Sequence, residues 1–154
     1  GGDVTFHVPG QLVVYPIFDL DLLHIGLAQY IFQLEESIIA SFKEYGLKGE
    51  RLEGAAGIWL KNNYKLDASE SKIAAIGVKA SRNVTMHGLA VNINTDLSYF
   101  DKIIACGLEG KETTSLQKEL EKEISIEDYK RIFLNAFEKV FQITKCKVEG
   151  TNRK

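Results

Sequence analysis

Apolar residues dominate two neighbouring stretches in the middle of the chain and predict two adjacent β-strands. Residues 72–78 form a run that is too apolar for a solvated surface and too rich in β-branched residues for a typical helix. A polar turn at 81–83 separates this run from a second strand at 84–93. The second strand alternates, with one predicted face formed by His87, Leu89, Val91 and Ile93 and the other by Met86, Gly88, Ala90 and Asn92.

The second of these faces is small at Gly88 and Ala90, and we expect a groove there in which a flat or linear ligand lies against the backbone. Lys72 begins the first strand, so we expect its side chain to lie near the core. Lys79 follows seven residues later on the same strand and is expected on the opposite face, because successive side chains alternate.

Amphipathic helices are predicted before and after this pair of strands. Between Ile25 and Tyr45, apolar residues recur at three- and four-residue spacing, which is typical of a helix with one buried side. Gly46 is suited to end this helix in the left-handed conformation. Ser125 and Asp128 resemble a capping box and predict the start of another helix in the last third of the chain.

The N-terminal residues are predicted to form a strand at 4–7, a turn at Pro9-Gly10 and a second strand at 11–17. The glycine pair at positions 1 and 2 has two interpretations: a plain turn, or a place where backbone N–H groups approach a ligand. His7 likewise is either a structural hydrogen-bonding group at a strand end or a residue that faces a pocket.

Composition limits the class of protein. With 154 residues, 45% of them hydrophobic, the chain fits one globular domain with a substantial core. A formal net charge of −2 and the lack of a basic stripe in the sequence argue against nucleic acid as the main partner. The apolar runs are short and no signal segment opens the chain, so we expect a soluble intracellular protein. The chain begins inside a motif without methionine, and we expect residues 1–154 to be a single domain that lacks its N-terminal segment.

The two cysteines are too few for a disulfide scaffold, and a reducing compartment would keep both as thiols. Cys106 precedes a glycine at the end of the stretch that begins with Lys72, whereas Cys146 lies in a charged tail. A lone cysteine is ordinarily a small, buried, apolar residue. The alternative is that Cys106 is a nucleophile, which requires neighbouring charges that favour its thiolate.

Four motifs resemble those of the lipoyl(octanoyl) transferases, a family of the lipoate- and biotin-ligase superfamily. They are Gly1-Gly2-Asp3-Val4-Thr5-Phe6-His7 with Pro9-Gly10-Gln11, Lys72-Ile73-Ala74-Ala75-Ile76-Gly77, Met86-His87-Gly88-Leu89-Ala90-Val91-Asn92, and Ala105-Cys106-Gly107. Val8 stands where the family usually has glycine, and Ala105 stands where it has proline. The resemblance implies an α+β fold, with a mixed β-sheet and helices packed on it, like the lipoate/biotin protein ligase catalytic domain.

The same resemblance implies an acyltransferase in which Cys106 is the acyl-thioester nucleophile and Lys72 is its activator. The residues that it implies for substrate binding are Gly1, Gly2, Asp3, Val4, Thr5, Phe6, His7, Ala75, Ile76, Gly77, Gly88, Leu89 and Ala90. The octanoyl (or lipoyl) group would pass from acyl carrier protein to a lysine of a lipoyl domain, in a 2-oxoacid dehydrogenase complex or the glycine cleavage H protein. This is the first step of lipoate cofactor assembly.

The implied enzyme is a monomer that needs neither ATP nor a metal, because a thioester already holds the acyl group in activated form. The resemblance also implies that neither nucleic acid nor a membrane is a partner, and that the protein is located in a cytoplasm of bacterial type, with an organelle as the alternative. Two alternatives stay open. An ATP-dependent lipoate or biotin ligase would share the fold, but no arginine-glycine loop or P-loop is found in the sequence. The other alternative is an inactive fragment that binds carrier domains without turnover.

Overall fold

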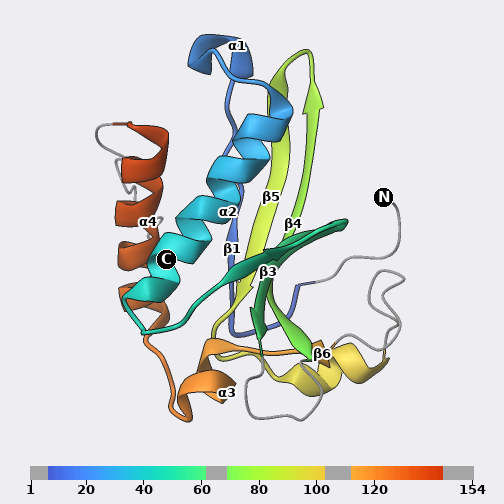
Figure 1. The fold of residues 1–154 in the computed structure, drawn as a ribbon, viewed down its shortest axis with the longest axis vertical. Helices are drawn as coiled ribbons and strands as arrows, with labels where there is room; N and C mark the ends of the chain where they lie inside the picture. The colour runs from blue at the N-terminus through green and yellow to red at the C-terminus, as the bar shows by residue number, and fades with distance from the viewer. Residues whose placement is uncertain (1–6, 62–68, 103–111, 144–154) are drawn as a thin grey trace, which may run out of the picture.

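A twisted β-sheet with helices on one face forms the body of the computed structural model (Figure 1). The structure describes residues 7–61, 69–102 and 112–143. Five strands follow one another in the spatial order β1-β5-β4-β3-β2, and β6 pairs with β4. The strands are β1 (Gln11–Val14), β2 (Glu50–Leu52), β3 (Ala55–Lys61), β4 (Glu70–Ser81), β5 (Val84–Asn92) and β6 (Glu112–Thr113). The β4–β6 pair is parallel and the other pairs are antiparallel, so the predicted mixed sheet is confirmed.

The helices are α1 (Leu20–Leu23), α2 (Leu27–Lys43), α3 (Leu116–Leu120) and α4 (Ile126–Phe141), with a 3-10 helix η1 at Leu97–Lys102. Helix α2 confirms the helix that was predicted between residues 25 and 45, and Gly46 follows it with a φ of 71°. Ser125 caps α4, since its Oγ accepts the backbone N–H of Asp128 at 3.2 Å. The predicted capping residue is therefore confirmed.

The long hairpin β4–β5 is the centre of the sheet and agrees with the two strands that the sequence predicted. Its turn consists of Arg82 and Asn83, whose φ angles of 51° and 60° are both left-handed. A two-residue turn of this kind matches the twist of the flanking strands and fixes the register Ser81↔Val84. His87 departs from the predicted alternation. It has a φ of 64° and is exposed, while Leu89 on the same predicted face is buried.

A β-bulge between β3 and β4 changes which face of the sheet Lys72 occupies. Ile58 is opposite Ala74, but the next residue of β3, Trp59, is opposite Lys72. One extra residue in β4 therefore reverses the alternation. Beyond the bulge Lys79 is exposed, on the face away from the helices. The prediction that Lys72 and Lys79 lie on opposite faces is wrong, because the bulge puts both on this outer face.

The hydrophobic core lies between the sheet and helices α2 and α4. Every fourth residue of α4 from its first turn onward is a buried aromatic: Tyr129, Phe133, Phe137 and Phe141. The rings of Phe137 and Phe141 stack with centroids 4.4 Å apart. From the sheet, the core receives Ile58, Leu60, Ile73, Ala74, Leu89 and Val91. Because this core occupies one face, the opposite face is the one available for a site.

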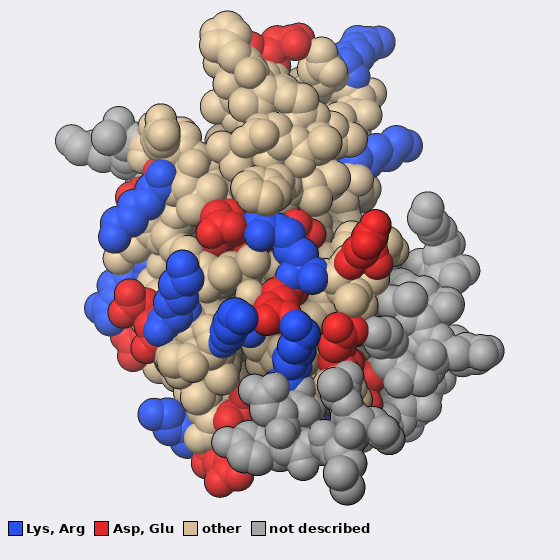
Figure 2. Space-filling view, viewed as in Figure 1, with Lys and Arg blue, Asp and Glu red and all other residues tan. Residues whose placement is uncertain are grey.

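Charged side chains of both signs lie close together on the face seen in Figure 2, and its upper end carries few of them. Among the ion pairs of the described residues, the guanidinium of Arg51 on β2 contacts Glu35 at 2.8 Å and Glu36 at 2.9 Å, both on α2. The same guanidinium lies 4.1 Å from the ring centroid of Phe32, so the group ties β2 to α2. Within the described residues, no helix has the length and apolar character needed to cross a membrane.

Candidate active site around Lys72

Lys72 is half-buried on the outer face of the sheet, beside a tryptophan. Its Nζ lies 5.0 Å from the ring centroid of Trp59, the residue opposite it on β3. Trp59 is 2% exposed and yet is not part of the core under the helices, to which its neighbours Ile58 and Leu60 belong. The side chain of Lys72 is therefore placed against an apolar surface, but on the side of the sheet away from the main core.

Gly57 makes room for the stem of Lys72. Its φ of 115° is a conformation that residues with side chains rarely adopt. A Cβ at this position would also overlap the carbonyl oxygen of Ala74 and lie 3.1 Å from Cε of Lys72. No role was predicted for this glycine from the sequence, and in the structure it lets a lysine side chain pass close to the backbone of β3.

Strand β6 brings the chain that follows Cys106 directly to Lys72. Thr113 is opposite Lys72 in the parallel pair, and Thr114 donates its backbone N–H to the carbonyl oxygen of Lys72 at 2.9 Å. The hydroxyl of Thr114 donates to a carboxylate oxygen of Glu119 at 2.5 Å, which holds this connection on α3. Cys106 itself lies in residues 103–111, outside the described part of the chain, six residues before Glu112.

A chain of side-chain amides connects two of the motif segments with Thr114, the residue that follows β6. Gln11 accepts the backbone N–H of Val8 at 3.0 Å and donates to the side-chain oxygen of Asn92 at 2.8 Å. Asn92, which is 5% exposed, donates in turn to the carbonyl oxygen of Thr114 at 3.0 Å. The motifs contain both amide residues, but this connection between them was not predicted from the sequence. The signal that could have found it was a pair of amide residues within otherwise apolar strands, since a buried amide needs partners.

The small residues predicted to form a groove do not all face open space. Gly88 is buried, and a Cβ there would overlap the carbonyl oxygen of Val14 and lie 2.9 Å from Cδ of Pro16. The room at Gly88 is therefore filled by the last residue of β1 and the chain that follows it, and the predicted opening at this residue is wrong. Gly77, its partner on β4, is exposed, and a Cβ added to it would have no neighbouring atom within 4 Å.

The open part of the outer face is consequently on β4, around Ala75 and Gly77, on the strand that begins beside Lys72. Ala75 is exposed and is opposite Ala90 on β5. Ile76 and Leu89 were also predicted to line the substrate, but both side chains pack into the core on the helix side. Their backbone alone is available to the outer face.

His7 is the one described residue among the N-terminal residues that were predicted to bind substrate, since residues 1–6 lie outside the described part of the chain. Its side chain is exposed, and its Nε2 forms a hydrogen bond with the hydroxyl of Tyr15 at 2.8 Å. This contact agrees with a structural hydrogen-bonding role. Gly1, Gly2, Asp3, Val4, Thr5 and Phe6 stay predictions.

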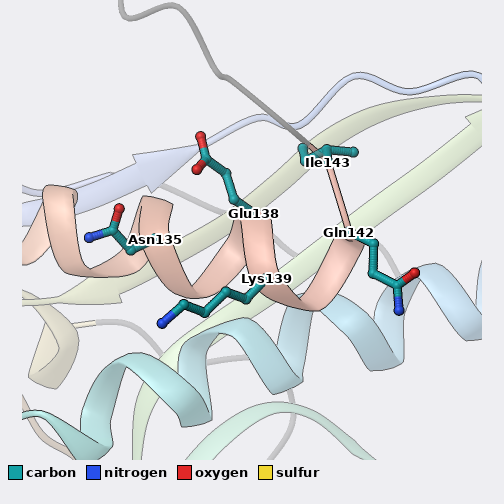
Figure 3. A pocket seen from close by; sticks show the side chains of 5 residues that line it. All are labelled: Asn135, Glu138, Lys139, Gln142 and Ile143. Carbon is teal, nitrogen blue, oxygen red and sulfur yellow. The ribbon is translucent and has the colours of Figure 1, made fainter.

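Helix α4 carries a shallow hollow that is separate from the surroundings of Lys72. Its lining consists of Asn135, Glu138, Lys139, Gln142 and Ile143 (Figure 3). These residues belong to α4 and the turn after it, whereas Lys72 and its neighbours belong to β3, β4 and β6. Among the described residues, no group of three or more His, Cys, Asp or Glu side chains is arranged to hold a metal ion.

Solved structures with this fold are lipoate and biotin protein ligases. The bi-partite lipoate protein ligase of Thermoplasma acidophilum, solved with its E2 lipoyl domain, gives a TM-score of 0.70 at 15% identity and covers 99% of this chain and 59% of its own. The biotin protein ligase of Aquifex aeolicus gives a TM-score of 0.63 at 14% identity, covering 86% of this chain and 53% of its own. At such identities the likeness concerns the fold, and it confirms the predicted class.

The family is defined by sequence. A family model described as the lipoyl protein ligase A/B catalytic domain matches residues 1–138, and the chain belongs to this family. A protein of Christiangramia forsetii named Octanoyltransferase is 50% identical over 143 residues, which are 92% of this chain and 60% of that protein. An Octanoyltransferase of Parabacteroides distasonis is 52% identical over 141 residues, which are 89% of this chain and 63% of that protein. The chain thus spans about 60% of the length of these relatives.

Proposed function

We propose that this chain carries the chemistry of an octanoyltransferase. In this proposal an octanoyl group moves from acyl carrier protein to a lysine of a lipoyl domain, in a 2-oxoacid dehydrogenase complex or a glycine cleavage H protein, in the bacterial cytoplasm. Cys106 holds the acyl group between the two transfers and Lys72 activates it. Relatives named Octanoyltransferase at 50% and 52% identity support this choice over the ligases that share the fold at 14–15% identity.

The reaction is two acyl exchanges. In the first, the Cys106 thiolate attacks the octanoyl carbonyl, the bond to the carrier's sulfur breaks, and the carrier leaves as a thiolate that takes up a proton. In the second, the lysine amine of the lipoyl domain attacks the Cys106 thioester, an amide forms, and the amine loses a proton as Cys106 becomes a thiol again. The first step exchanges one thioester for another of similar energy, so no ATP is consumed.

One observation carries the proposal: Thr114 donates its backbone N–H to the carbonyl oxygen of Lys72 at 2.9 Å. The chain leaving the segment that contains Cys106 is therefore fixed at Lys72. A cation near a thiol favours the thiolate, which is the nucleophilic form. The open surface at Ala75 and Gly77 continues from Lys72 along β4 and offers a small-residue path for a linear apolar chain.

The test is incubation with octanoyl-acyl carrier protein in the absence of ATP, followed by intact mass measurement. We expect one octanoyl adduct that a lipoyl domain then removes. A product that forms only with ATP and free acid would identify a ligase instead. A chain that binds the carrier but acquires no adduct would be a binding fragment, and the proposed transfer chemistry would be rejected.

A further inference from the structure

We propose that Trp59 is a positioning residue for Lys72, whose ammonium it holds over its indole ring on the outer face of the sheet. The part that Lys72 plays in acyl transfer rests on the proposed function. The contact between the two side chains does not, because it stands on the geometry of β3 and β4.

The distance between the two groups fits an attraction between a cation and an aromatic ring. Nζ of Lys72 is 5.0 Å from the ring centroid, within the range of about 6 Å over which the ring attracts a cation. Trp59 is 2% exposed, so protein atoms rather than water surround the ring. Such contacts are stronger when they are shielded from water. The ammonium is thus held by a buried surface rather than by a mobile surface contact.

The ring has a fixed orientation of its own. Its Nε1–H donates to the carbonyl oxygen of Ala55 at 3.3 Å, at the beginning of the same strand. The stem of Lys72 is held as well, since its Cε passes where a side chain on Gly57 would stand, 3.1 Å from the position of a Cβ. Both partners of the contact are therefore constrained by β3.

The bulge between β3 and β4 makes this contact possible. Because Trp59 is opposite Lys72 while Ile58 is opposite Ala74, the lysine shares a face with the indole rather than with the core under the helices. Bulges commonly redirect a side chain next to an active site. Here the bulge, Gly57 and Trp59 together determine the position of the Lys72 side chain.

Other charged groups on the surrounding strands also affect the pKa of Lys72, and their contribution must be measured separately. On the neighbouring strands, Glu50 is engaged by Lys61 at 2.6 Å and by Lys48 at 3.0 Å, and these contacts lower the pKa of Glu50. Glu70 on β4 and Glu112 on β6 are the other carboxylates of the strands beside Lys72. The variants Glu70→Gln and Glu112→Gln measure the contribution of these charges independently of the indole.

A ring that attracts the ammonium favours the protonated form of Lys72 and raises its pKa relative to an aliphatic neighbour. Trp59→Met should lower the pKa of Lys72 by about 0.5 to 1 unit. Trp59→Phe also loses part of the indole volume but keeps an aromatic ring. The pKa of Lys72 should therefore stay close to its wild-type value in this variant. A purely structural role would make the two variants alike.

The pKa of Lys72 can be measured by competitive acetylation with acetic anhydride against pH, followed by peptide mapping, with Lys79 as the internal reference. We expect the pKa to fall in Trp59→Met and to stay near the wild-type value in Trp59→Phe. Equal pKa values in wild type and Trp59→Met would overturn the inference, as would equal falls in the two variants.

A measurement on the wild type covers the case in which Trp59→Met does not fold. Methylene protons next to an indole face are shifted upfield by its ring current, so the ε-methylene of Lys72 should be displaced from those of the exposed lysines in a proton–carbon spectrum. An ordinary shift would overturn the inference without any variant. Alkylation of Cys106 in the same proteins tests the proposed function separately. If the pKa of Lys72 falls but the alkylation rate does not change, the contact stands and the activator role fails.

Discussion

Thr114 and Lys72 are joined by a backbone hydrogen bond of 2.9 Å, between residues that lie 42 positions apart in the sequence. In the part of the chain that the structure describes, Glu112 and Thr113 of β6 make the parallel pair that accompanies this bond. So short a strand contributes little to the sheet, but it fixes where the segment containing Cys106 rejoins the fold. Cys106 and Lys72 are therefore tested as a pair.

The first prediction is that the octanoyl adduct forms on Cys106. After incubation with octanoyl-acyl carrier protein, peptide mapping should find the added mass on the peptide containing Cys106, and hydroxylamine should remove it, because it is a thioester. Cys146→Ser, the matched control, should acquire the adduct at the wild-type rate. An adduct on Cys146, or a hydroxylamine-sensitive adduct in Cys106→Ser, would show that the nucleophile was misassigned.

The second prediction concerns Lys72 as the activator of the thiol. An ordinary cysteine titrates near pH 8.5, and a cation at roughly 4 Å with an effective dielectric near 20 stabilises a thiolate by up to about 4 kcal/mol before desolvation opposes it. We expect the pKa of Cys106 to lie below this ordinary value, because the ammonium of Lys72 favours the thiolate. In Lys72→Met, Cys106 should therefore react more slowly with iodoacetamide at pH 7. At high pH its alkylation rate should equal that of the wild type.

Lys79→Met is the control for this measurement, in a Cys146→Ser background for all proteins. Lys79 lies on the same outer face as Lys72, but seven residues along the strand, or roughly 23 Å away at about 3.3 Å per residue. Its removal should leave the alkylation profile unchanged. Overlapping profiles for wild type and Lys72→Met would exclude the activator role.

The sequence predicted those parts of the site that depend on a regular pattern of neighbouring residues. The strands at Lys72 and Leu89 were predicted correctly because their hydrophobic runs lie between clear turn residues. The face of Lys79 was predicted wrongly, since a bulge arises from the pairing of β4 with β3 and leaves no signal in β4 alone. The prediction of open space at Gly88 was wrong for a related reason. The atoms that fill it belong to Val14 and Pro16, more than 70 residues away in the sequence.

A third prediction uses Gly57, which combines a φ of 115° with a crowded Cβ position. Gly57→Ala should destabilise the protein by more than the approximately 1–2 kcal/mol that a left-handed backbone alone costs a residue with a side chain. Gly54→Ala is the control, because Gly54 has a φ of 76° but no atom within 4 Å of its Cβ position. Urea unfolding should separate the two variants. Equal losses would mean that the overlap at Gly57 relaxes freely.

A fourth prediction concerns the amide chain through Asn92. Asn92→Leu keeps the approximate volume but leaves Nε2 of Gln11 and the carbonyl oxygen of Thr114 without these partners. Each buried polar group left unsatisfied costs about 1–3 kcal/mol. Asn135→Leu on the exposed side of α4 is the control and should change the free energy of unfolding by less than about 0.5 kcal/mol. Similar stabilities for the two variants would show that the amide chain is not a stabilising connection.

The last prediction is an alkaline loss of stability caused by Tyr129. Burial raises the pKa of its hydroxyl, which forms a hydrogen bond with Ser41 at 2.8 Å. An unfolded tyrosine titrates near pH 10, so the folded state keeps a proton that the unfolded state loses above that pH. The stability is therefore complete below about pH 10 and falls as the pH rises further, by up to about 1.4 kcal/mol per pH unit for this group.

Tyr129→Phe removes the titrating hydroxyl while keeping the ring in its place beside Phe42 and Phe133. It should be less stable than the wild type at pH 8, because the bond to Ser41 is lost, yet its stability should fall less steeply between pH 10 and 11. Tyr30 and Tyr45, whose pKa values burial also raises, contribute to the slope that remains. Urea midpoints against pH measure both slopes. Parallel slopes for the two proteins would mean that Tyr129 ionises in the folded state as readily as in the unfolded chain.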